Sequence, residues 1–105
     1  MALTSDYKET IRSRVQRDPA FYDGLLEEAM ECLFSGEVEV GKTILRDFIK
    51  ATVGFETLSR RLNKKPESLI RMFGPTGNPT VSNFFQVLAF LQKQQGIHFG
   101  LKLSR

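Results

Sequence analysis

The chain has 105 residues, a length that fits one compact domain and excludes a large barrel, a doubly wound nucleotide-binding sheet or two independent cores. Its composition, 41% apolar and 26% charged, is that of an ordinary globular domain, and no apolar run approaches the ~20 residues of a membrane span. The net charge of +3 hides a division, because residues 1–41 carry four Lys or Arg against nine Asp or Glu, whereas residues 42–105 carry eleven against three. The basic part favours a polyanionic partner, although two solvated faces of one protein would explain the division equally well.

The N-terminal third is predicted to form two helices. Apolar residues spaced four apart over residues 4–16 indicate the first, which is an extra N-terminal helix. The second begins at Asp18-Pro19, an N-cap followed by proline at the first helical position, continues to about Phe34 and is stopped by Gly36. The residues expected on its buried face are Phe21, Leu25, Ala29, Met30 and Leu33.

Three helices are predicted in the middle of the chain, over residues 40–52, 55–62 and 66–73. Gly54 ends the first of them, and the Lys64-Lys65-Pro66 run separates the two short ones. The residues expected in the core are Ile44, Leu45, Phe48 and Ile49 from the longer helix, with Leu58, Leu62, Leu69 and either Met72 or Phe73 from the short ones.

Residues 74–79, with the sequence GPTGNP, predict a loop. Thr80 or Ser82 then caps a long final helix that continues to about residue 95 and buries Phe84, Val87, Leu88 and Leu91.

The C-terminal tail changes period. Over residues 97–103, apolar Ile, Phe, Leu and Leu alternate with His, Gly and Lys, which is typical of a half-buried β-strand. Because no other segment alternates in this way, the predicted strand has no partner in its own chain. It could pair with a second copy or with another protein's sheet, or the tail could instead pack on the last helix.

Residues 36–43, with the sequence GEVEVGKT, match the spelling of a phosphate-binding loop. Such a loop follows a buried strand and directs its backbone N–H groups at phosphates. Here the preceding segment is helical in pattern, and Glu37 and Glu39 would place negative charge beside the phosphates. We therefore expect no nucleotide site and interpret the match as a loop between helices that contains two glycines.

The most informative stretch is Phe55–Phe73, in which two short helices are separated by a tight turn. This is the plan of a helix-turn-helix, whose second helix lies in the DNA major groove. Ser59 is small enough for the second helix to approach, and Asn63 tolerates the left-handed conformation that such a turn needs. Any two short helices joined by a solvated basic turn would give a similar pattern.

The candidate DNA-contacting residues divide by role. Arg71 could present its guanidinium to guanine, and Ser68 could make an adaptable contact at the helix start. Basic side chains nearby are suited to phosphates, and the loop and cap before the last helix could reach the DNA backbone or simply cap that helix. The full set is Arg60, Arg61, Lys64, Lys65, Glu67, Ser68, Arg71, Thr76, Asn78 and Thr80.

Four segments together resemble the addiction-module antidote family, the HigA-like antitoxins with a Cro/repressor-type helix-turn-helix. They are LRDFIKATVGF at 45–55, Leu58-Ser59, SLIRMF at 68–73 and GNPT at 77–80. The resemblance covers roughly residues 21–99 and implies a repressor-like five-helix domain. The helix over residues 4–16 has no counterpart in that pattern, and Asn63 stands where repressor-type motifs usually carry glycine.

The predicted fold is therefore all-α, with a five-helix helix-turn-helix domain, extra N-terminal helices and a short C-terminal β-strand. One domain covers residues 1–105, with N-terminal helices to residue 36, the core over 40–95 and the strand over 97–103. The resemblance implies a homodimer that binds double-stranded operator DNA, represses its own operon and neutralises a RelE/HigB-like ribonuclease toxin.

Two other functions remain open at this point: a repressor without a toxin, and a protein-interaction module whose basic surface meets an acidic protein. The start of the chain lacks a signal-peptide pattern, so we expect a cytoplasmic protein without a membrane association. A single Cys32 and a single His98 leave no protein-made zinc site and little for nucleophilic catalysis. We expect neither an enzyme nor a cofactor.

Overall fold

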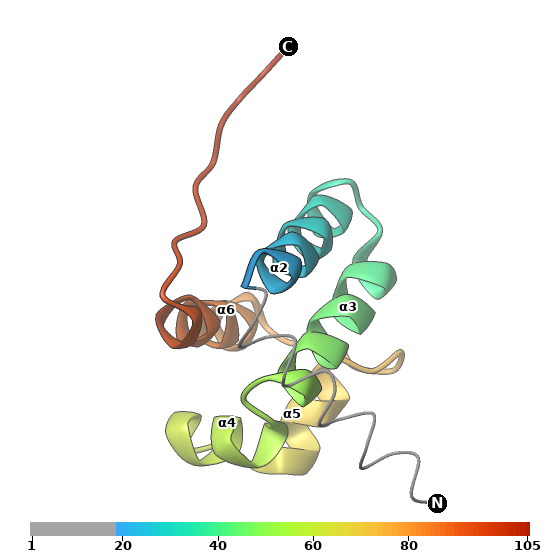
Figure 1. Ribbon diagram of the computed structural model, residues 1–105. Helices are drawn as coiled ribbons and strands as arrows, with labels where there is room; N and C mark the ends of the chain where they lie inside the picture. The colour runs from blue at the N-terminus through green and yellow to red at the C-terminus, as the bar shows by residue number, and fades with distance from the viewer. Residues whose placement is uncertain (1–18) are drawn as a thin grey trace, which may run out of the picture.

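A computed structural model describes residues 19–105 as an all-helical arrangement (Figure 1). The helices are α2 (Pro19–Phe34), α3 (Val38–Ala51), α4 (Phe55–Leu62), α5 (Pro66–Met72) and α6 (Val81–Gln95). α2 and α3 pack along one another, α4 contacts both α5 and α6, and the chain leaves α6 as an extended C-terminal tail. The helix expected over residues 4–16 lies outside the described residues.

The helix boundaries follow the local chemistry. α2 begins at Pro19 and ends before Gly36, whose φ of 87° is accessible to glycine at little cost. α6 begins after Thr80, whose Oγ1 accepts a hydrogen bond from the Asn83 backbone N–H at 3.1 Å. Of the two caps predicted for this helix, Thr80 is thus the one used.

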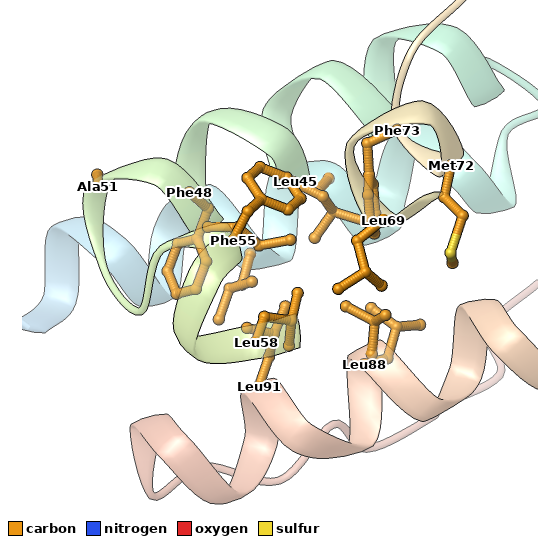
Figure 2. Packing of buried hydrophobic residues seen from close by; sticks show 14 of the residues in the cluster. Leu45, Phe48, Ala51, Phe55, Leu58, Leu69, Met72, Phe73, Leu88 and Leu91 are labelled. Atoms are coloured by element: carbon orange, nitrogen blue, oxygen red, sulfur yellow. The ribbon is translucent and has the colours of Figure 1, made fainter. Parts of the chain in front are cut away.

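The core is one cluster to which all five helices contribute (Figure 2). Leu45 and Phe48 of α3, Leu58 of α4, Leu69 of α5 and Leu91 of α6 are completely buried. Edge-on aromatic contacts extend the cluster from Phe48 to Tyr22 of α2, and tilted ones link Phe73 to Phe55 and Phe84. The buried faces predicted for the short helices are confirmed.

The predicted buried face of α2 was partly wrong. The side chains of Tyr22 and Leu26 are each only 1% exposed, whereas Phe21 is 38% exposed and Leu25 is half-buried. Both sets are apolar and lie one position apart along the helix, so spacing alone could not select between them. Contact between Tyr22 and Phe48 of α3 selects the observed face, with ring centroids 5.7 Å apart.

Two further expectations need correction. Gly41 does not lie in a loop, because α3 begins at Val38 and includes it. Residues 19–105 contain no β-strand, so the strand expected over residues 97–103 does not form within the single chain. Instead Ile97 and Phe99 pack against the core cluster, and the Phe99 backbone N–H donates to Oε1 of Gln92 at 2.6 Å.

Candidate nucleic-acid interface

The connection between α4 and α5 is held by its own polar groups. Asn63 has φ 54° and ψ 50°, the left-handed conformation predicted for it. The Lys64 backbone N–H donates to the Ser59 carbonyl at 3.0 Å, and the Ser59 hydroxyl donates to the Lys64 carbonyl. These bonds close the turn and fix the orientation of α5 relative to α4.

α5 has a buried side and an exposed side. Leu69 and Met72 face the core, whereas Glu67, Ser68 and Arg71 are exposed. No ion pair joins Arg71 to Glu67 in the structure described here, so the guanidinium is not held one turn back along the helix. The outer face of α5 therefore presents Ser68 and Arg71 to solvent, with Lys65 exposed at the helix start.

The other predicted cations differ in where they are held. Arg60 is exposed on α4, whereas the Arg61 guanidinium carbon lies over the Phe90 ring of α6, 5.9 Å from its centroid. Lys64 is half-buried, and its Nζ donates to Oδ1 of Asn83 at 3.1 Å. Arg61 and Lys64 thus connect the turn region to α6, a role that their sequence positions did not indicate.

The loop before α6 is packed tightly against the end of α5. A Cβ added at Gly77 would lie 1.8 Å from the Arg71 carbonyl oxygen, so only glycine fits there. Thr76 and Asn78 are exposed on either side of it. The loop and α5 consequently form one unit, with Arg71 at their contact.

Lys42 is the residue that sequence reasoning missed. It is 3% exposed, its Nζ donates to the Gly77 carbonyl at 2.9 Å, and Oε2 of Glu39 lies 3.2 Å away. The lysine therefore connects α3 to the loop that supports α5. Its position three residues before Leu45 places it on the buried side of an amphipathic helix, which was the available signal.

The same geometry argues against a phosphate-binding loop. Gly41, Lys42 and Thr43 lie inside α3, where the Gly41 backbone N–H donates to the Glu37 carbonyl at 3.1 Å. A Cβ at Gly41 would lie 2.8 Å from the Leu33 side chain and 3.0 Å from the Ala29 carbonyl oxygen. The glycine thus allows α2 and α3 to approach, and the lysine is already bound to protein oxygens.

Charge is separated along the molecule. α2 contains four Asp or Glu and no Lys or Arg, whereas residues 55–73 contain five Lys or Arg against two Glu. Figure 1 shows α2 and the tail at the opposite end from α4 and α5. The acidic and basic surfaces are therefore distinct places on the fold.

Comparison of the chain with known protein families, with curated proteins and with solved structures found no significant match. Within residues 19–105, no helix is both long enough and apolar enough to cross a membrane. The same part of the chain brings together no group of three or more His, Cys, Asp or Glu side chains suited to a metal ion.

Proposed function

We propose that this protein binds operator DNA in a sequence-specific manner through α4 and α5, and acts as the antitoxin and autorepressor of a toxin–antitoxin module. The observation that carries the proposal is the geometry of the α4–α5 pair. A three-residue turn with Asn63 in the left-handed conformation joins two short helices, and the second buries Leu69 while presenting Ser68 and Arg71 to solvent. This geometry supports a helix-turn-helix in which α5 is the recognition helix.

In this function α5 enters the major groove. Arg71 donates two hydrogen bonds to one guanine, and Ser68 makes a single contact near the helix start. Lys65 and Arg60 contact phosphates, which fix the register of the helix but do not distinguish sequences. Arg61 and Lys64 have a supporting role, because their contacts with Phe90 and Asn83 hold α6 against the turn.

A dimer is part of the proposal because α5, with seven residues, reaches too few base pairs to define an operator alone. Two copies related by a two-fold axis would read two half-sites about 34–36 Å apart. The proposed partner in neutralisation is a RelE/HigB-like ribonuclease toxin, and this part rests on the four segments that resemble the antidote family.

The direct test is binding of the full chain to a duplex taken from the region upstream of its own gene, across a salt series. Phosphate contacts release counterions, so log K should fall linearly with log salt, with a slope near −0.9 per phosphate contacted. A scrambled duplex is the matched control and should bind at least about 10³-fold more weakly at physiological salt. Equal, salt-insensitive affinity for both duplexes would overturn the DNA-binding function and favour a protein-interaction module.

The toxin is tested separately. Co-expression with the product of an adjacent small, basic reading frame should restore growth that the product alone arrests. If that frame is absent, or its product is harmless, the DNA-binding function remains as that of a repressor without a toxin.

A further inference from the structure

A groove of about 530 Å³ lies between α2 and the C-terminal tail. Its apolar lining includes Met30 and the exposed Phe34 of α2, together with Phe99 of the tail. Asp23, Glu27 and Glu31 line the same groove from α2. These three are spaced four apart, so they form one acidic row along the helix.

The tail side of this groove has free backbone groups. Beyond Phe99, residues 100–105 make no backbone–backbone hydrogen bond within the described part of the chain. Leu101 is 83% exposed and Leu103 is 96% exposed, although both continue the alternation that Ile97 and Phe99 begin in contact with the core. The tail is thus an extended segment with strand periodicity and no strand beside it.

We propose that this groove is the docking site for an extended, basic segment of a partner protein, which pairs with the tail as an added β-strand. Alternate side chains of that segment would cover the apolar lining and Leu101, and the basic ones between them would meet the acidic row of α2. Charge complementarity identifies the partner as basic, because the groove is lined by three carboxylates of α2 and, among Lys and Arg, only by Lys102 of the tail.

A second copy of this chain is the competing occupant, since its tail is also apolar and carries Lys102 and Arg105. Antiparallel pairing of two tails requires a two-fold axis perpendicular to them. The tail points away from the α4–α5 end of the molecule (Figure 1), so that axis would send the two α5 helices to opposite ends of the dimer. Such a dimer could not place both on adjacent half-sites of one operator, whereas a different partner leaves α5 free.

This argument against a second copy rests on the proposed function. The capacity of the groove to bind a basic strand does not depend on the proposed function. A peptide therefore tests the groove independently of DNA and of any toxin.

The probe is a short fluorescein-labelled peptide of alternating lysine and valine, titrated with the full-length protein and followed by fluorescence anisotropy. We expect a Kd of about 10 μM at low salt, weakened several-fold at about 300 mM NaCl because the charges are partly exposed. Two control peptides should bind at least about tenfold more weakly: one with glutamate for lysine, which is repelled by α2, and one with a central proline, which cannot complete the strand.

The protein variants make the test specific. Glu27→Lys/Glu31→Lys should reduce peptide affinity at least about tenfold. Glu28→Lys is the matched control on the same helix, because Glu28 does not line the groove, and it should stay within about twofold. A chain ending at Phe99 keeps the packed part of the tail and should also lose binding. Circular dichroism checks that each variant is folded.

Three results would overturn the proposal: equal binding of the proline peptide, equal effects of Glu28→Lys and the double substitution, or full binding by the shortened chain. Light scattering can also overturn the proposal. A full-length dimer that dissociates on removal of residues 100–105 would show that a second copy occupies the tail. The double variant should keep its affinity for operator DNA, so failure of the groove and failure of the DNA-binding function are distinguishable.

Discussion

Lys42 is almost completely buried, and its ammonium group is shared between the Gly77 carbonyl and the Glu39 carboxylate. Burying a charged group is favourable only when hydrogen bonds replace its hydration. The two oxygens do so here, and the result is a cross-link between α3 and the loop behind α5. The residue that would contact a nucleotide in a phosphate-binding loop is used in this fold for tertiary structure.

Replacing this lysine should therefore affect stability. We expect Lys42→Met to lower the free energy of unfolding by about 1–3 kcal/mol, because the methionine fills the space but leaves the Gly77 carbonyl without its donor. Urea denaturation measures the change, and Lys50→Met, at an exposed position of the same helix, should stay within about 0.5 kcal/mol of the original protein.

The nucleotide prediction is tested on the same residue. Calorimetric titration of the original protein with ATP or GTP and Mg²⁺ should show no heat of binding, because the lysine is occupied and the glycines are helical or left-handed rather than arranged around a phosphate. Micromolar affinity that disappears in Lys42→Ala would contradict this interpretation.

Gly77 gives the sharpest steric prediction. An added methyl group would lie 1.8 Å from the Arg71 carbonyl oxygen, and that atom belongs to backbone rather than to a flexible side chain. We expect Gly77→Ala to lower stability by about 1–3 kcal/mol through displacement of the loop or α5. In the same loop Gly74→Ala meets only ordinary contacts, at 3.5 Å and beyond, and should be nearly neutral by thermal unfolding.

The Cys32 thiol is half-buried on α2, and its pKa is raised, first by desolvation and then by the Glu37, Glu28 and Glu31 carboxylates. Because the folded-state pKa is the higher one, the contribution of the protonated thiol to stability persists below the unfolded value and is lost as pH rises through the folded value. Alkylation by iodoacetamide at about pH 8.5 should be slower than that of glutathione, because less thiolate is present.

A paired substitution identifies the electrostatic part of this effect. Glu37→Gln should shift the pH profile of alkylation towards lower pH, whereas Glu27→Gln, a carboxylate that does not act on the thiol, should leave it unchanged. Identical profiles for the two variants would show that Glu37 does not contribute to the raised pKa of the thiol.

At the scale of the elements, the prediction about sequence recognition concerns side chains of α5. Arg71→Ala should cost about 1–3 kcal/mol on the native operator and reduce the preference for operator over scrambled duplex, because a contact to a base edge is lost. Lys65→Ala should weaken binding to both duplexes alike and reduce the salt slope by about one. Titrations of both variants across a salt series distinguish the two roles.

The Arg71 variant also has a decisive negative outcome. If it folds normally and its operator-to-scrambled ratio equals that of the original protein, Arg71 does not read a base.

Helix positions were largely predictable because strong local signals mark them. Gly36, Asn63 and Thr80 each act within a few residues of their own position, and the structure uses all three as expected. The inward-facing residues of α4 and α5 were also predictable, since each short helix has one clear apolar face.

The errors arose where tertiary contacts decide between local alternatives. α2 has apolar residues on adjacent faces, and Phe48 selects Tyr22 rather than Phe21. Gly41 resembles a loop residue in sequence, but Leu33 and the Ala29 carbonyl need its missing side chain. Nothing local links Lys42 to Gly77, which is 35 residues away, so no pattern could have found that bond.

At the scale of the whole molecule, the loop, α5 and α3 are joined in series. Lys42 holds Gly77, Gly77 packs on Arg71, and the turn after α4 fixes the other end of α5. The helix proposed to read DNA is thus supported at both ends although it has only seven residues. Preorganisation of this kind reduces the ordering cost of binding.

The separation of acidic α2 from the basic α4–α5 region also gives the described part of the chain an electric dipole. In the field of a polyanion this dipole experiences a torque that turns the α4–α5 end forward before any contact is made. A larger share of encounters then occurs in the productive orientation, and the association rate constant rises above the value set by random collision. If the proposed function holds, the acidic helix would in this way speed the approach of the opposite end of the molecule to DNA.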